Sequence, residues 1–197
     1  MTEQLSLDGL GGPANPTDRL FFALFPPLSL ARRIAADWQE RSRALGLRGN
    51  TVEADRLHVT LVHLGDHPGL PPGLESAARE AAAGLVGQRA FEVCFDRIET
   101  FGQGRGRQLQ VLCASDGAAA LCEFQAALAT ALLRAGLGRW MDKRQGFRPH
   151  ITLQYSHRSL PEQVAESVRW PVTGFSLVNS KLGRHEHRHL AHWPFQQ

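Results

Sequence analysis

The chain has 197 residues, of which 43% are hydrophobic and 21% charged, as in ordinary globular proteins. Its formal net charge of +3 is too small to predict nucleic-acid binding from bulk electrostatics, and no apolar run approaches the length of a membrane-spanning helix. Three cysteines, Cys94, Cys113 and Cys122, lack Cys-x-x-Cys spacing, which argues against a disulfide framework or zinc site. Because no signal-peptide pattern is present either, we expect a cytoplasmic protein with no membrane partner.

Arginine supplies all basic residues except Lys143 and Lys181. The planar guanidinium binds phosphate through two parallel hydrogen bonds, so this bias is compatible with a phosphate-containing substrate. A genome that prefers arginine codons is the better explanation, and the bias alone decides nothing.

The first half of the chain begins with residues 1–17, rich in Gly, Pro and small polar residues, which predict a flexible tail before a single domain over 18–197. Apolar runs and helical spacing then predict, in order, a buried strand over 19–26, a helix over 28–47, a strand over 57–65 and a helix over 73–88.

The second half continues with an antiparallel pair of strands over 91–101 and 107–115, a helix over 118–138, a strand over 147–156, one or two helical turns within 161–170, and strands over 172–182 and 189–195. This mixture of hairpins and crossovers predicts an α+β fold with antiparallel or mixed sheets. A helix precedes "RLHVTL" in one half and "RPHITL" in the other, so we expect two related lobes that face each other.

The sequence His-x-Thr-Leu occurs twice, at residues 58–61 and 150–153. Because residues i and i+2 of a strand lie on the same face, each His shares a face with its Thr, and the two aliphatic residues occupy the opposite face. Arg56 and Arg148 precede the two histidines by two positions and fall on the same polar face. The pattern predicts two Arg-His-Thr rows on open surfaces, with the aliphatic residues in the core.

These residue types suit displacement at phosphorus. Two histidines can act as general base and general acid near neutral pH, and threonine hydroxyls can donate hydrogen bonds to phosphate oxygens. An in-line displacement needs a base beside the attacking oxygen and an acid beside the leaving oxygen. A single histidine in a strand is usually a structural residue, but two matched motifs favour catalysis. The sequence therefore predicts phosphodiester chemistry that needs no metal or cofactor.

The two motifs resemble the signature of the 2H phosphoesterase superfamily. Together with "RLFFALFPP", "LHVTLVHLG", "FRPHITL" and "FSLVNSKL", they resemble the bacterial RNA 2′,3′-cyclic phosphodiesterases, also known as 2′-5′ RNA ligases. The similarity extends over residues 19–195. It implies a bilobal α+β fold, with antiparallel sheets facing a central cleft and helices outside, and hydrolysis of an RNA 2′,3′-cyclic phosphate to a 2′-phosphomonoester without a cofactor.

The resemblance also implies individual roles. His58 would be the proton donor to the departing 3′ oxygen, and His150 the proton acceptor from water. Thr60 and Thr152 would bind the non-bridging phosphate oxygens, and Arg148 would be a further phosphate ligand. We expect RNA ends or cyclic nucleotides as substrates, no obligate protein partner and a monomer.

One departure from the family pattern is His63, which stands where a phenylalanine is usual. By strict alternation His63 would lie on the face opposite His58, where it would pack or support the site. The other is a longer segment before the first strand.

Three other interpretations remain open. His185, His187 and His189 alternate and would share one face of an extended segment, as in a zinc or nickel site, although no carboxylate or cysteine completes the set. The protein could instead bind RNA ends without catalysis. The same acid-base pair would also serve reversible joining of RNA ends through a 2′-5′ bond.

Overall fold

The computed structural model describes residues 15–102, 106–114, 118–142, 146–184 and 186–196. The helices are α1 (Leu28–Ala44), α2 (Leu74–Ala83) and α3 (Ala119–Arg134), with short 3₁₀ turns at Ala54–Arg56 and Leu137–Arg139. The strands are β1 (Asp18–Leu24), β2 (Gly49–Thr51), β3 (Val59–His67), β4 (Phe91–Phe101), β5 (Gln108–Cys113), β6 (His150–Ser156), β7 (Gln163–Val172), β8 (Gly174–Lys181) and β9 (Glu186–Pro194). The predicted α+β class is confirmed.

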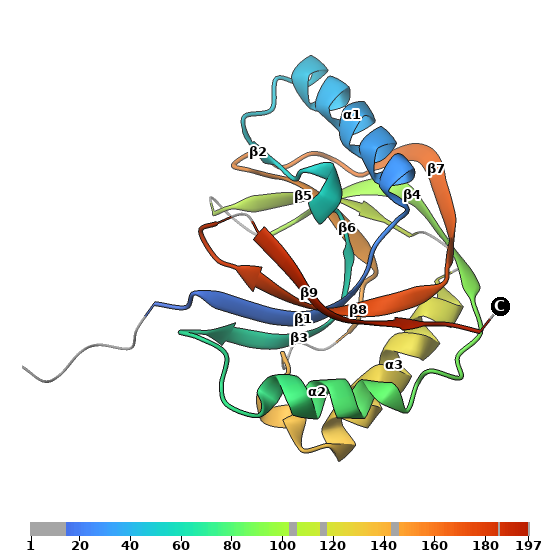
Figure 1. Ribbon diagram of the computed structural model, residues 1–197. Helices are drawn as coiled ribbons and strands as arrows, with labels where there is room; N and C mark the ends of the chain where they lie inside the picture. The colour runs from blue at the N-terminus through green and yellow to red at the C-terminus, as the bar shows by residue number, and fades with distance from the viewer. Residues whose placement is uncertain (1–14, 103–105, 115–117, 143–145, 185, 197) are drawn as a thin grey trace, which may run out of the picture.

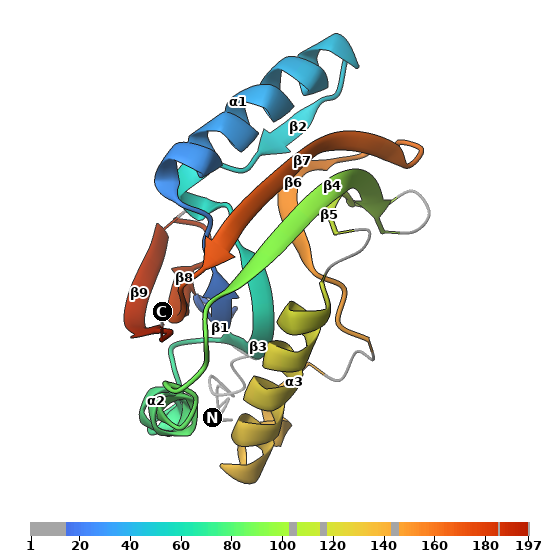
Figure 2. The same ribbon diagram turned by 90° about the vertical axis from the view of Figure 1, so that its right-hand side faces the viewer.

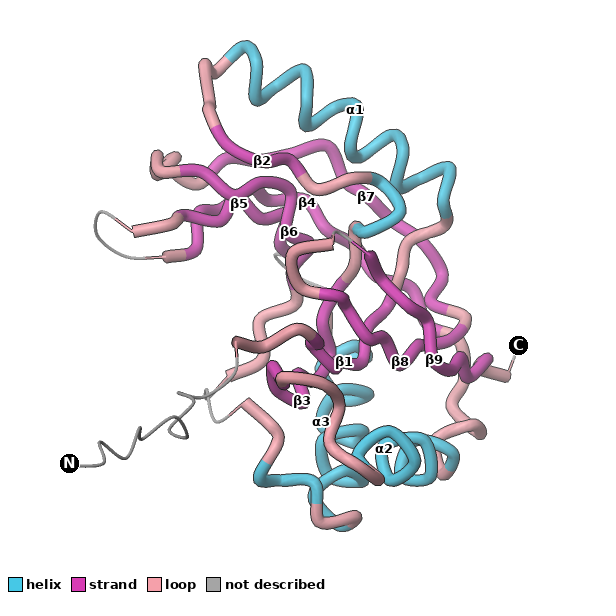
Figure 3. Tube along the Cα trace, turned by 60° about the vertical axis from the view of Figure 1, so that its left-hand side comes forward, coloured by secondary structure: helices cyan, strands magenta, loops and turns pink. Residues whose placement is uncertain are grey.

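All strands belong to one antiparallel sheet, in the order β7-β4-β5-β6-β3-β1-β8-β9, with β2 paired to β6. We call β2 and β4–β7 the central half and β1, β3, β8 and β9 the terminal half. Helix α1 covers the central half, whereas α2 and α3 lie at the opposite end against the terminal half (Figures 1 and 2). Figure 3 shows the same arrangement, with helices at both ends and strands between them.

Strand β1 is buried on both faces, as the apolar run Leu20–Leu24 predicts. Leu20 and Phe22 belong to the main hydrophobic core, which the helices cover. Phe21 and Ala23 form a second, smaller cluster with Val178 on the other face. The terminal half therefore has an apolar layer on the face away from its helices.

The predicted helices bury the expected faces. In α3 the buried stripe is Leu121, Phe124, Leu128 and Leu132, as its spacing predicts. In α1 the indole N–H of Trp38 donates to the side-chain oxygen of Gln154 at 3.1 Å, and the Ser42 hydroxyl donates to the same oxygen at 2.7 Å. These contacts satisfy a buried amide and fix α1 on β6.

The prediction of helical turns within residues 161–170 is wrong. This segment belongs to β7, which pairs with β4 along the edge of the sheet. Pro161 would suit the first residue of a helix, but here it precedes an edge strand whose exposed side chains include Val164, 86% exposed, and Glu166. Pro171 also fits an edge strand, since no ladder hydrogen bond from its nitrogen is required there.

The predicted tail falls mostly outside the described residues. Thr17 is anchored, because its N–H donates to the carbonyl of His67 at 2.8 Å and its carbonyl accepts from the N–H of Leu182 at 2.9 Å. The three cysteines are free thiols. Among the described helices none has both the length and the hydropathy needed to cross a membrane.

Candidate active site

The two His-x-Thr-Leu motifs meet where the halves of the sheet join. Val59 of β3 pairs with Ile151 of β6 in an antiparallel register. Both side chains are fully buried, and Leu61 and Leu153 join them in the main core, as predicted. One further step of this register in each direction places Thr60 opposite His150 and His58 opposite Thr152. All four predicted polar residues therefore gather on one face of the junction.

Both imidazoles are held in the same way. Nδ1 of His58 lies 2.6 Å from the carbonyl oxygen of Arg56, and Nδ1 of His150 lies 2.7 Å from that of Arg148. A carbonyl oxygen only accepts hydrogen bonds, so Nδ1 carries the proton in each ring. The backbone thus leaves each Nε2 available for proton transfer to or from a bound molecule.

His58 sits in an aromatic environment supplied by distant strands. Its ring stacks on Phe21 with centroids 4.9 Å apart, lies 5.7 Å from Phe25, and meets the edge of His187 at 5.2 Å. Burial is the main cause that lowers the pKa of His58 to about 4, and nearby His150 lowers it further, although the hydrogen bond to the Arg56 carbonyl acts in the opposite sense. The fold therefore holds His58 neutral at pH 7.

His150 has a simpler environment. Its ring meets that of Phe101 edge-on, with centroids 4.9 Å apart. Burial lowers the pKa of His150, and the positive charge of Arg148 contributes in the same direction. Before an anion binds, both site histidines therefore take up a proton less readily than an ordinary imidazole.

Arg148, the predicted phosphate ligand, lies beside His150 but has a partner of its own. Its Nη2 lies 2.6 Å from a carboxylate oxygen of Glu99, and its guanidinium lies 4.6 Å from the Phe101 ring centroid. The side chain is 62% exposed and remains accessible to a ligand. Glu99 and Phe101 come from β4, and no local pattern identified them in advance.

Each motif ends in a β-bulge. Between β1 and β3 the register passes from Ala23 opposite Thr60 to Phe22 opposite Val62, which leaves Leu61 as the extra residue. Between β5 and β6 the register shifts in the same way around Leu153. The leucine of each His-x-Thr-Leu motif is therefore an inserted residue, and such bulges bend strands and redirect the side chains that follow.

The bulge corrects the predicted orientation of His63. Since Leu61 and Val62 are both buried in the main core, the alternation shifts by one and His63 returns to the face of Thr60. His63 lies opposite Phe21, and its Nε2 is 3.0 Å from Asp66, which also accepts two hydrogen bonds from Arg19. The prediction that His63 lies opposite His58 is wrong.

The described part of the histidine-rich segment contributes to the aromatic environment of the site. His187 contacts the rings of Phe21 and His58, and His189 lies 4.6 Å from Phe25. The Nε2 of His187 is 3.5 Å from the guanidinium of Arg56. His185 falls outside the described residues, and within the described ones no three His, Cys, Asp or Glu side chains are grouped as metal ligands.

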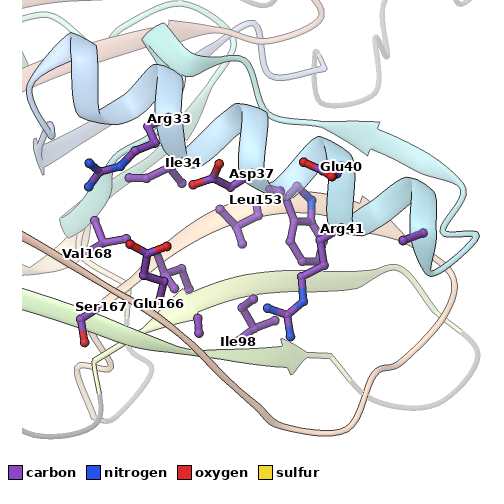
Figure 4. Close-up of a pocket in the computed structure, with 14 residues that line it drawn as sticks. Arg33, Ile34, Asp37, Glu40, Arg41, Ile98, Leu153, Glu166, Ser167 and Val168 are labelled. Atoms are coloured by element: carbon purple, nitrogen blue, oxygen red, sulfur yellow. The ribbon is translucent and has the colours of Figure 1, made fainter.

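A separate cavity of about 450 Å³ lies between α1 and the central half, on the side of β6 away from the histidines (Figure 4). Trp38, Leu153 and Val168 are among its apolar lining, and Arg33, Asp37 and Glu166 stand at its polar side. Neither His58 nor His150 lines it, so it is distinct from the candidate site.

Comparisons with known proteins identify the family and the fold. A family model described as the 2′-5′ RNA ligase superfamily matches residues 26–184. The structure of E. coli LigT complexed with 3′-AMP is 26% identical, with a TM-score of 0.69 over 93% of this chain and 99% of that one. The LigT complex with ATP is 25% identical, with a TM-score of 0.70 over 92% and 99%. TT0787 of Thermus thermophilus, 23% identical, shares the fold with a TM-score of 0.74 over 89% and 97%. A search of curated proteins gives no significant match.

Proposed function

Because the chain belongs to the 2′-5′ RNA ligase superfamily, we propose that it hydrolyses the 2′,3′-cyclic phosphate at RNA ends to a 2′-phosphomonoester, without a metal. The observation that carries the proposal is the pair of equally oriented imidazoles, His58 and His150, at the Val59–Ile151 junction. We propose further that the two halves of the sheet form two lobes around a cleft that receives the substrate.

In this proposal the phosphate binds between the motifs. The hydroxyls of Thr60 and Thr152 donate hydrogen bonds to its non-bridging oxygens. The guanidinium of Arg148 contacts an oxygen while it keeps Glu99 as its partner. The negative charge of the phosphate raises the pKa of both nearby histidines and allows one of them to carry a proton at neutral pH.

Hydrolysis then proceeds with one proton removed and one supplied. Nε2 of His150 takes a proton from water as the water oxygen bonds to phosphorus. The bond between phosphorus and the 3′ oxygen breaks, and Nε2 of protonated His58 gives its proton to that oxygen. The product carries a phosphate on the 2′ oxygen. A 2′-5′ joining reaction would follow the same steps in the same direction, with an RNA 5′ hydroxyl in place of water: its oxygen bonds to phosphorus as the bond to the 3′ oxygen breaks.

The decisive experiment uses an oligoribonucleotide that ends in a 2′,3′-cyclic phosphate, with excess EDTA present. The proposal expects a 2′-phosphate product from the wild type and a loss of about 10²–10⁴-fold in rate for His58→Ala and for His150→Ala. His157→Ala is a matched control, because His157 is exposed at the end of β6 and is expected to keep full activity. Binding without product would favour an RNA-end binder, and activity lost in EDTA would require a metal.

A second substrate separates the acid from the base. A phosphodiester with a p-nitrophenolate leaving group needs little protonation of that group. His58→Ala should therefore lose far less activity on this ester than on RNA, whereas His150→Ala should lose as much on both. The opposite result would exchange the two assigned roles.

A further inference from the structure

We propose that Tyr155, with Arg107 stacked on its ring, forms a nucleobase-binding subsite beside the two motifs. It would take the base of the nucleotide that carries the cyclic phosphate. This inference deepens the proposed function and rests on it for the identity of the ligand.

The Leu153 bulge places Tyr155 on the site face. Since Leu153 and Gln154 both point to the α1 side, Tyr155 returns to the face of Thr152. Cross-strand register supports this, because Tyr155 lies opposite Leu109, and Leu109 lies opposite Phe101, whose ring contacts His150. Tyr155 therefore belongs to the same surface as the proposed general base.

Its distance from the motif suits a nucleotide. Tyr155 stands three residues beyond Thr152 along β6, roughly 10 Å at the usual rise of a strand and less across a bulge. A ligand whose phosphate contacts Thr152 would extend its ribose toward Tyr155 and place its base at the ring.

The Tyr155 ring has an environment that suits stacking on a nucleobase. The guanidinium of Arg107 lies 3.9 Å from the ring centroid, so one face holds a cation while the side chain remains partly exposed. Among the described residues no hydrogen bond holds the Tyr155 hydroxyl, although Arg19 lies close enough to interact with it electrostatically. Aromatic rings and arginine planes are the usual stacking partners of unpaired bases, and they tolerate any base.

His63 provides an internal comparison. It stands five residues after His58, as Tyr155 stands five after His150, and each follows a leucine bulge. The imidazole of His63, however, is occupied by Asp66, which is bound in turn by Arg19. Tyr155 is therefore available to a ligand, whereas His63 is engaged by Asp66. This difference places the nucleobase beside Tyr155.

The test compares base-bearing and base-free substrates. Adenosine 2′,3′-cyclic phosphate and ribose 2′,3′-cyclic phosphate would be hydrolysed by the wild type, Tyr155→Leu, Tyr155→Phe and, as the matched control, His63→Leu. We expect Tyr155→Leu to raise KM for the adenosine substrate by about 5- to 100-fold, with kcat nearly unchanged. Its KM for the ribose substrate, and both KM values of the other variants, should stay within about twofold of the wild type. An equal rise on the ribose substrate, or no rise on the adenosine one, would overturn the proposal.

A binding measurement tests the proposed subsite independently of whether the protein hydrolyses the substrate. Calorimetry measures the affinity for 2′-AMP and for inorganic phosphate. It therefore detects the subsite even if the protein hydrolyses neither of the two cyclic phosphates. Weaker binding of 2′-AMP but not of phosphate by Tyr155→Leu would support the subsite whatever the activity. Equal binding of 2′-AMP by Tyr155→Leu and the wild type would refute it, even if the wild type proves to be a cyclic phosphodiesterase.

Discussion

Val59 and Ile151 form the register pair that joins β3 to β6, and each lies directly beside one of the two site histidines. Both side chains are fully buried in the main core, with 0% exposure. The relative position of His58 and His150 therefore depends on the packing of two aliphatic residues rather than on a polar contact between the histidines.

Removing a methylene group from this junction should lower the catalytic rate as well as the stability of the fold. Ile151→Val should lower the free energy of unfolding by about 0.5–1.5 kcal/mol, the usual cost of a lost methylene group. It should also lower kcat by about 3- to 10-fold, because small misplacements of catalytic groups are costly. Ile34→Val in α1, also buried, is the control. Urea unfolding and steady-state rates test both variants, and equal kcat values for the two would show that the junction does not position the site.

The pH dependence of the reaction follows from the lowered histidine pKa values. In the free protein the pKa of His58 is about 4 and that of His150 lies below 6.5, and catalysis needs one ring protonated. The protonated form is lost as pH rises through these values, so kcat/KM should be greatest on the acid side of pH 6.5. The profile of kcat should be shifted to higher pH, because bound phosphate favours the charged rings. A kcat/KM maximum at about pH 7.5 or above would be inconsistent with this account.

His187 should influence the site through burial. Its ring covers one edge of His58, and burial is the main cause of the low pKa of His58. His187→Ala should admit water and raise the pKa of His58 from about 4 toward 6.5, which NMR titration of the imidazole signals can follow. His157→Ala should leave that titration unchanged. If the pKa of His58 is unchanged in His187→Ala, Phe21 and Phe25 alone are sufficient to exclude water from His58.

Asp18 should make stability depend on acid pH. Burial alone would raise the pKa of Asp18, but hydrogen bonds from Lys181, Thr17 and Asn179 outweigh it and lower the pKa to about 2. A carboxylate with a depressed pKa stabilises the fold above its unfolded value near 3.8, and this contribution of about 2 kcal/mol is lost as pH falls toward 2. Asp18→Asn should therefore unfold more easily in urea at pH 7, while the difference from the wild type should shrink by pH 2. A constant difference would exclude this linkage.

The sequence was sufficient for the paired motifs because their signal is local. Strict alternation over three residues placed His58 and Thr60 on one face, and the structure agrees. The same rule failed at His63, since a bulge depends on the register with a neighbouring strand and leaves no mark in the strand's own sequence. β7 was misread for a related reason: its pairing with β4, about seventy residues earlier, outweighed a local preference for helix.

Most residues that surround the histidines could not be predicted. Phe21 and Phe101 come from strands that are far apart in sequence, and nothing in either segment sets them apart. The alternation of the histidine-rich segment does single out His187, but as a metal ligand and not as a ring that packs on His58. Their arrangement around the site follows from strand order, which non-local hydrogen bonding determines.

The order of the strands has a consequence for how the molecule acquires its structure. The terminal half combines β1 and β3 from the beginning of the chain with β8 and β9 from its end, and the central half is built from the segments between them. A single cut anywhere between β1 and β9 would divide the strands of the terminal half between two fragments. Because most of these contacts are distant along the chain, we expect folding to be slow and cooperative, with both imidazoles reaching their working positions only in the last steps.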